Sequence, residues 1–196
     1  MRRERSIEPA YFEALYQDKG DPWAFETSAY EAAKYDETLA VLPAERFANV
    51  LEVGCANGVL TARLGARCDA LLAVDVSETA LAAARARCAD QPNIAIEQRR
   101  LPAEAPMGRF DLVLLSEVVY YWDSADIVAL AAYLRDAVPS GGHLLLVHWI
   151  GETDYPKSGD DAVAELRAAL GDLVAIVRSD RHDAYRLDLW RMGQAG

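Results

Sequence analysis

The sequence predicts an α/β fold in which a mostly parallel sheet lies between helices as a three-layer sandwich. From about residue 47 onward, short apolar segments alternate with helical ones. The early apolar segments are nearly continuous, which is typical of parallel strands buried on both faces. The last two expected strands have no helix between them, so they should pair as an antiparallel hairpin. We therefore expect a Rossmann-like, seven-stranded sheet that is parallel except at its C-terminal end.

Residues 1–46 are expected to form a helical N-terminal arm ahead of a sheet domain at 47–196. Phe12 and Tyr16 lie at helical spacing, and Pro43 ends a second helical segment. The arm is rich in aromatic side chains, and Trp23, Tyr30 and Tyr35 can close over a ligand as a lid. Alternatively, Trp23 only pins the arm to the domain.

The remaining elements follow from apolar runs and capping residues. Ser77, and Asp123 or Ser124, are natural N-caps of helices. Two closing strands, 172–179 and 182–190, should be joined by a tight turn at Asp180-Arg181. The other expected strands are residues 49–53, 70–75, 93–97, 110–115 and 143–149, with further helices at 57–67 and 162–170.

Composition narrows the class of protein. The chain has 196 residues, 52% of them hydrophobic, and a net charge of -11, so it is expected to fold as a globular domain that phosphate backbones and anionic lipids repel. An uncharged or cationic small molecule fits this charge better than nucleic acid or a membrane. The three cysteines match neither a zinc pattern nor a CxxC motif. We expect reduced thiols, no metal site, a cytoplasmic location, and a monomer or homodimer.

The strongest functional signal lies where the first two expected strands end. Gly54 and Gly58 lie between a strand and a helix, so a ligand can approach the backbone there closely. Asp75 ends the second strand, where an acid can accept hydrogen bonds from both hydroxyls of a ribose. The glycines can also make a plain turn, and Asp75 can cap the next helix. Together with the sheet order, however, the pattern predicts a nucleoside-type cofactor.

The glycine spacing does not match the G-x-G-x-x-G motif of dinucleotide sites. Glu52 would repel a pyrophosphate and suits a cationic ligand with an amino group. The form E-x-G-x-x-x-G followed by V-D-V-S resembles the signature of Rossmann-like S-adenosylmethionine (SAM) methyltransferases. That resemblance implies that Glu52 organises the loop beside the methionine part of SAM and that Asp75 holds the ribose. Ala56 replaces a commoner glycine, a mild departure because alanine is small.

The same resemblance implies further cofactor contacts. Leu101 would lie beside the adenine, where it can pack on the ring or belong to the core, and Lys34 can pair with the SAM carboxylate. The expected cofactor residues are Trp23, Tyr30, Lys34, Glu52, Gly54, Cys55, Asn57, Gly58, Asp75, Val76, Leu101 and Ser116.

Several segments between residues 21 and 149 are similar to one branch of these enzymes, the nodulation protein S (NodS) family of N-methyltransferases. They are Asp21-Pro22-Trp23, Tyr30-Glu31-x-x-Lys34-Tyr35, Leu51-Glu52-Val53-Gly54-Cys55, Phe110-Asp111-Leu112, Ser116-Glu117-x-x-Tyr120-Tyr121 and His148-Trp149. Members of that name methylate the free amine of a deacetylated chitin oligosaccharide. The resemblance implies methyl transfer from SAM to a small-molecule amine, with S-adenosylhomocysteine as the second product.

An amine acceptor must lose a proton to expose its lone pair, and a carboxylate or imidazole can take that proton. Glu117 follows the fourth strand and His148 lies near the end of the fifth, so both are expected at the same edge of the sheet. Glu117 can alternatively be a helix cap or surface acid, and His148 a core histidine. Tyr120, Tyr121 and Trp149 are expected to line the acceptor pocket, although one of the tyrosines can be core packing.

Three other functions compete with an amine methyltransferase. An NAD-dependent oxidoreductase uses the same architecture, but the missing dinucleotide motif and Glu52 argue against it. Methyl transfer to oxygen or carbon of a small metabolite is compatible with every residue named above. A catalytically silent SAM-binding module is disfavoured by the clustering of polar and aromatic residues at one edge of the sheet.

Overall fold

The computed structural model describes residues 2–193, which form two compact units. The first unit is Glu8–Arg100; the second contains the residues up to Ile7 together with those from Leu101 onward. The helices of the arm therefore belong to the same unit as the first strands of the sheet. The domain boundary expected at residue 46 remains a prediction.

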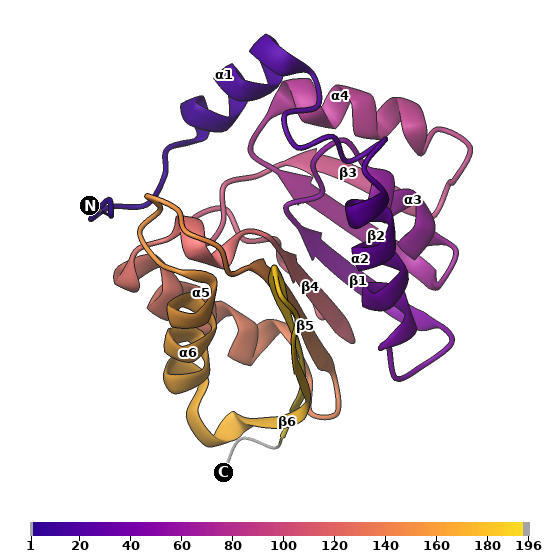
Figure 1. Ribbon diagram of the computed structural model, residues 1–196. Coiled ribbons are helices and arrows are strands. Elements are labelled where there is room, and N and C mark those ends of the chain that lie inside the picture. Colours follow the sequence, from indigo (N-terminus) through magenta and orange to yellow (C-terminus); the bar gives the residue numbers. More distant parts are fainter. Residues whose placement is uncertain (1, 194–196) are drawn as a thin grey trace. The chain divides into compact units, whose positions relative to one another are not determined.

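The first unit contains three parallel strands in the order β3-β2-β1. The strands are β1 (Phe47–Val53), β2 (Cys68–Asp75) and β3 (Ile94–Gln98), and the helices are α1 (Pro9–Lys19), α2 (Ala29–Ala40), α3 (Val59–Gly65) and α4 (Glu78–Arg87). As predicted, Ser77 caps α4 by accepting a hydrogen bond from the Ala80 N–H at 3.2 Å. Figure 1 shows α3 and α4 beside these strands.

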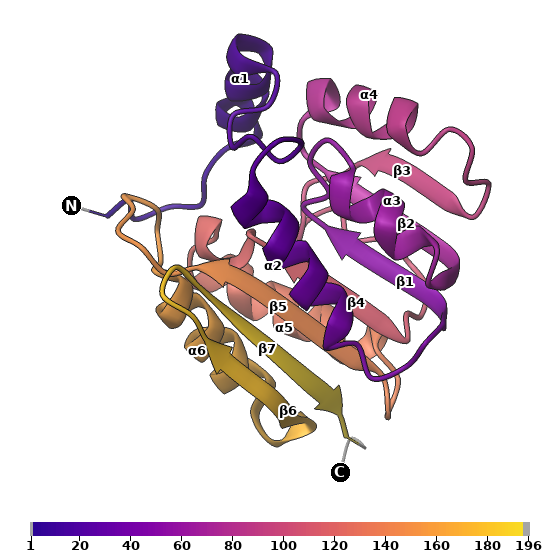
Figure 2. The same ribbon diagram turned by 45° about the vertical axis from the view of Figure 1, so that its right-hand side comes forward.

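The second unit contains four strands in the order β4-β5-β7-β6. Its strands are β4 (Leu112–Ser116), β5 (His143–Trp149), β6 (Val174–Arg181) and β7 (Tyr185–Met192), its helices α5 (Ser124–Ala137) and α6 (Gly159–Leu170), and its 3₁₀ turns η1 (Val119–Tyr121) and η2 (Gly171–Leu173). β4 and β5 are parallel, whereas β7 is antiparallel to both β5 and β6 (Figure 2). The predicted C-terminal hairpin is therefore confirmed, and Asp123 caps α5.

The position of the C-terminal turn was predicted wrongly. The expected turn at Asp180-Arg181 lies inside β6, and the chain reverses later, between Arg181 and Tyr185. Two features of β6 explain why the end of this strand was predicted wrongly. Residues 175–179 are all exposed, so the strand has no alternation of buried and exposed positions. An irregularity between Ile176 and Arg178 also shifts the pairing with β7.

Two smaller expectations can be compared with the structure. The three cysteines are buried and form no disulfide, as predicted. Among the described residues, none of the helices has both the length and the apolar character that a membrane crossing requires.

Candidate functional site

The loop after β1 is held against the end of β2. The N–H groups of Gly54 and Cys55 both donate to the Val74 carbonyl, at 2.9 and 3.1 Å. Gly54 and Gly58 have φ angles of 82° and 79°, which favour glycine. At Gly58 space matters as well, because a Cβ would lie 2.9 Å from Ala84 in α4. The glycines thus allow a tight turn that brings backbone close to the strand ends.

Asp75 at the end of β2 closes this loop. Its Oδ2 accepts a hydrogen bond from the Ala56 N–H and its Oδ1 one from the Ser77 N–H, each at 3.0 Å. Burial raises the pKa of Asp75, and these backbone hydrogen bonds oppose that rise. Each carboxylate oxygen can accept a second hydrogen bond. The side chain therefore shapes the loop and retains the capacity to accept from a pair of hydroxyls.

Glu52 is a buried acid beneath the same loop, with 1% of its surface exposed. Burial raises its pKa to about 7; Thr61 lowers it somewhat and the charge of Asp75 raises it further. The Oε2 of Glu52, the Oδ1 of Asn57 and the Oγ1 of Thr61 are buried without a hydrogen bond of normal geometry in the described residues. Buried acceptors of this kind usually have a partner. They fit a ligand that brings a cationic amino group, as SAM does.

The arm is tied to this region through α1. Glu13 Oε2 accepts from the Ser77 hydroxyl at 2.7 Å and from the Thr79 N–H at 3.2 Å. Hydrogen bonds from the side chains of Thr79 and Ser77 lower the pKa of Glu13 to about 2. The buried ring of Tyr16 lies near Asp75: burial, and then the Asp75 charge, raise the pKa of Tyr16. Neither residue was expected at the site, because helical spacing alone does not show what a helix packs against.

The predicted arm residues have clear packing roles. Trp23 packs edge-on against Tyr16 and stacks with Phe25, with ring centroids 5.7 and 5.6 Å apart. The buried Lys34 ammonium lies 3.0 Å from a carboxylate oxygen of Glu31 and 5.3 Å from the ring centroid of Tyr30. All of these contacts lie within the arm itself. The lid and the pairing of Lys34 with SAM remain predictions.

In the second unit, Glu117 follows the C-terminal end of β4. Its φ of 56° lies in the left-handed region that non-glycine residues rarely adopt. The Glu117 N–H donates to the Val147 carbonyl at 2.8 Å. Its Oε2 accepts from the Tyr120 hydroxyl and from the Trp149 N–H, both at 2.7 Å. Residues from η1 and β5 thus hold one carboxylate in a defined position.

His148 has no exposed surface. Its Nε2 accepts a hydrogen bond from the Val119 N–H at 3.2 Å, so this nitrogen carries no proton of its own. Its ring packs edge-on against Tyr120, with centroids 5.4 Å apart. This geometry suits a positioning role, in which His148 fixes η1 and thereby Tyr120, better than direct proton transfer.

Tyr120 and Tyr121 belong to a tyrosine cluster that also includes Tyr155. The ring of Tyr155 stacks on Tyr120 with a centroid distance of 5.4 Å and meets Tyr121 edge-on at 4.7 Å. Burial raises the pKa of both Tyr120 and Tyr121. Tyr155 is half-buried and lies in the polar segment between β5 and α6, where no periodic pattern marks a packed ring. For that reason the sequence did not indicate it.

Three other expected cofactor residues are Val76, Leu101 and Ser116. Val76 and Leu101 follow the ends of β2 and β3, and Ser116 ends β4. Val76 is half-buried and its carbonyl accepts from the Gln98 side chain at 2.9 Å. Leu101 is buried at the start of the second unit's long segment, and Ser116 is half-buried at the end of β4. Their contacts with SAM remain predictions.

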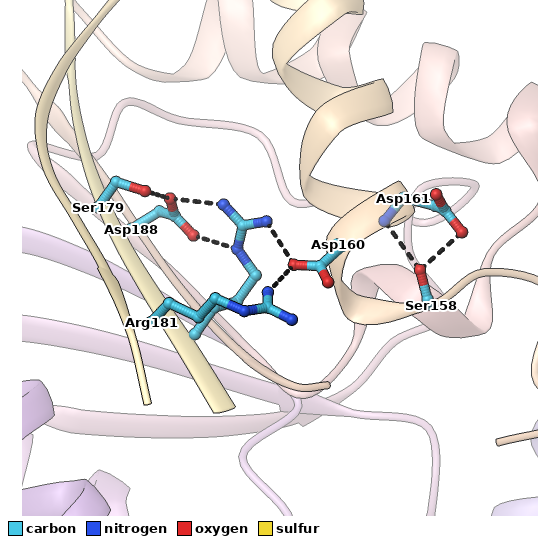
Figure 3. A network of polar contacts seen from close by, with 7 residues as sticks. Ser158, Asp160, Asp161, Ser179, Arg181 and Asp188 are labelled. Atoms are coloured by element: carbon cyan, nitrogen blue, oxygen red, sulfur yellow. Dashed lines mark hydrogen bonds and ion pairs between the residues drawn. The ribbon is translucent and has the colours of Figure 1, made fainter. Parts of the chain in front are cut away.

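A polar network fixes the start of α6 on the C-terminal hairpin (Figure 3). The buried Asp188 accepts two hydrogen bonds from the Arg186 guanidinium, at 2.7 and 2.9 Å, and one from the Ser179 hydroxyl at 2.6 Å. Arg186 also binds Asp160 in the first turn of α6 at 2.9 Å, and Arg181 binds the same carboxylate. The network therefore anchors one end of the segment between β5 and α6.

The backbone of Ala56 leads to a stability prediction. Its φ is 50°, so the residue needs a left-handed conformation, which corrects the expectation that only the small size of alanine matters there. This conformation costs an L-residue about 1–2 kcal/mol, against about 0.5–1 kcal/mol of extra chain entropy for glycine. Ala56→Gly is expected to raise the free energy of unfolding by about 0.5–1 kcal/mol, measured by chemical denaturation.

Ala62→Gly is the matched control, because Ala62 lies inside α3 and glycine there should cost about 1 kcal/mol. Equal destabilisation by both substitutions would contradict the strained conformation at Ala56.

The chain is similar to proteins of one known family. A family model described as nodulation protein S (NodS) matches residues 14–141. Nodulation protein S of Bradyrhizobium diazoefficiens is 34% identical over 119 residues, which are 60% of this chain and 56% of that protein. A solved methyltransferase candidate from Pseudomonas syringae is 38% identical, with a TM-score of 0.73 over 84% of this chain and 99% of its own.

The fold is that of the Rossmann-like SAM methyltransferases. N-methyltransferase NodS from Bradyrhizobium japonicum WM9, solved with S-adenosylhomocysteine, has a TM-score of 0.83 at 19% identity, over 96% of this chain and 100% of its own. The family model spans more than half of the described sequence, and this chain belongs to the nodulation protein S (NodS) family. It spans little more than half the length of the curated relative that it matches. Fold and family are therefore those that the sequence predicted.

Proposed function

We propose that this protein is a SAM-dependent N-methyltransferase that acts on the amine of a small molecule, such as an amino sugar or chitooligosaccharide. The observation that carries the proposal is the carboxylate of Glu117, held at the end of β4 by Tyr120 and by the backbone of Trp149. A strained backbone is retained where the surrounding structure demands it, commonly at functional sites. Family membership supports the same activity.

In this proposal the first unit holds SAM. Asp75 accepts from the ribose hydroxyls, and Glu52 and Asn57 supply buried acceptors for the amino group. SAM supplies an activated methyl group on its sulfonium. Because the donor is already reactive, the protein mainly orients the two reactants, which can contribute roughly 7–11 kcal/mol.

Glu117 is proposed to remove the proton from the acceptor amine. Neutralising an amine of pKa about 10 at pH 7 costs on the order of 4 kcal/mol, and less for a sugar amine. The hydrogen bonds from Tyr120 and the Trp149 N–H aim the carboxylate and restrict its motion. A small-molecule acceptor, rather than nucleic acid, also suits the net charge of -11. A cytoplasmic location and a monomer or homodimer belong to the same proposal.

Glu117→Gln tests the proposed base. With a glucosamine trimer as acceptor, kcat is expected to fall about 100-fold, while the Kd for SAM measured by calorimetry stays nearly unchanged. The rate should also rise more steeply with pH, because solvent must then remove the proton.

Glu152→Gln provides the control, since Glu152 is an exposed acid in the same unit that should leave both quantities unaltered. Full activity of Glu117→Gln would show that the base lies elsewhere. Methylation of a hydroxyl instead of the amine would favour an O-methyltransferase.

A further inference from the structure

Glu13 is an acid of α1 on which hydrogen-bond donors from the start of α4 converge. Its Oε2 accepts from the Ser77 hydroxyl at 2.7 Å and from the Thr79 N–H at 3.2 Å. Its Oε1 accepts from the Thr79 hydroxyl and from the Gln17 side chain. The carboxylate thus lies at the N-terminus of α4, where a negative charge is favourable.

This arrangement requires an ionised carboxylate and not an amide. The hydrogen bonds from Thr79 and Ser77 lower the pKa of Glu13 to about 2, so the side chain is charged at neutral pH. All four of the groups around it donate, and both of its oxygens accept. A glutamine could present only one oxygen, and its NH₂ group would bring further donors to the same place.

Ser77 connects Glu13 with Asp75 at the end of β2. The residue has no exposed surface. Its N–H donates to the Asp75 Oδ1 at 3.0 Å, and its hydroxyl accepts from the Ala80 N–H while it donates to Glu13. A hydroxyl has a single proton to donate, and Glu13 takes this one. Without the Glu13 carboxylate, the Ser77 hydroxyl is expected to turn to Asp75, an acceptor already bonded to the same residue.

We infer that Glu13 is a positioning residue of the cofactor site, which acts through the Ser77 hydroxyl to keep the Asp75 carboxylate available to the ribose of SAM. This inference rests on the proposed ribose role of Asp75 and deepens it. Tyr16 lies one turn further along α1, on the same side of the helix. Burial, and then the charge of Asp75, raise the pKa of Tyr16, so this side of α1 lies near Asp75.

Two ligands can test this role without turnover. The protein is titrated calorimetrically with S-adenosylhomocysteine and with the analogue that lacks the ribose 2′-hydroxyl. The unsubstituted protein is expected to bind the analogue at least about tenfold more weakly. In Glu13→Gln, the ratio of the two Kd values should fall to about threefold or less, because the Ser77 hydroxyl then occupies Asp75. If both ligands weaken equally and the ratio stays unchanged, Glu13 is merely structural and the inference is overturned.

The double variant Glu13→Gln, Ser77→Ala tests the route through Ser77. Alanine keeps the N–H that binds Asp75 but has no hydroxyl to turn toward it, so the ratio of the two Kd values should return to that of the unsubstituted protein. A ratio that stays low would refute the action through Ser77. Asp18→Asn is the control, because Asp18 is an exposed acid of the same helix and should leave the ratio unchanged.

The outcomes separate this inference from the proposed function. If the unsubstituted protein binds both ligands equally, the ribose role of Asp75 is refuted and the positioning role of Glu13 with it. If the ratio of Kd values falls in Glu13→Gln but the protein methylates no amine, the proposed function fails and the positioning role stands. Glu13→Asp withdraws the carboxylate by one methylene group and should lower the ratio in the same way, so it decides the question if Glu13→Gln does not fold.

Discussion

Replacing Glu52 with glutamine is expected to stabilise the ligand-free protein above pH 7 and to weaken its binding of SAM at least tenfold. The carboxyl group is buried, and burial raises its pKa from 4.5 to about 7. The folded protein therefore keeps a proton on Glu52 that the unfolded chain has lost between these two pH values. Because the folded state binds more protons there, wild-type stability falls as pH rises through this window.

Glutamine does not titrate, so the stability of Glu52→Gln does not fall in this way as pH rises. The stability of the variant relative to wild type should grow by about 2 kcal/mol between pH 5.5 and pH 8, which thermal melts at both pH values can measure. The SAM affinity falls because the amide cannot offer a negative charge to the amino group. Glu45→Gln changes an exposed acid and should affect neither the pH dependence of stability nor the affinity for SAM. If Glu52→Gln bound SAM as tightly as the wild type, the proposed role of Glu52 in the cofactor site would be refuted.

Asp75→Ala is expected to weaken SAM binding at least tenfold, measured by calorimetric titration at constant pH. The substitution removes the acceptor proposed for the ribose hydroxyls. It also leaves the N–H groups of Ala56 and Ser77 without their partner, which costs about 1–3 kcal/mol for each group that stays buried and unpaired. Part of the effect will thus be a loosened loop.

Asp75→Asn separates these two effects. The asparagine retains one oxygen acceptor for the loop but loses the charge and one acceptor for the ribose, so SAM binding should still fall while most of the stability returns. Asp69→Ala, at the exposed start of the same strand, should leave SAM binding unchanged. Equal SAM affinity of Asp75→Ala and wild type would refute the ribose role. Binding of NAD without SAM by the unsubstituted protein would point to hydride transfer instead.

The sheet elements could be predicted because their signals are local. β5 has the predicted bounds, since its apolar run is bounded by Gly142 and a polar segment. The caps Ser77 and Asp123 were found because a helix N-terminus selects a few residue types. β6 was misplaced, since neither of its faces is buried and its pairing with β7 is irregular. A strand without a buried face has no periodicity to detect.

The residues of the candidate site could likewise be predicted only where their signal is local in the sequence. The motif residues Glu52 and Asp75 could be found from spacing along the chain. Glu13 and Tyr155 could not, because each reaches its partners only when distant segments meet. The role of His148 was open between base and core, and only the hydrogen bond to Val119 favours positioning.

The amino-acid sequence by itself determined the alternation of strands and helices, the glycine loop with its acids, and the family. These depend on residue type at short spacing, which the chain carries before it folds. The tertiary structure alone decided which hydrogen bonds hold Glu117, the burial that raises the pKa of Glu52, and the hydrogen bonds that Glu13 accepts from Ser77 and Thr79. The physical reason is that burial, charge proximity and steric exclusion act through space between residues, and spacing along the chain does not specify them.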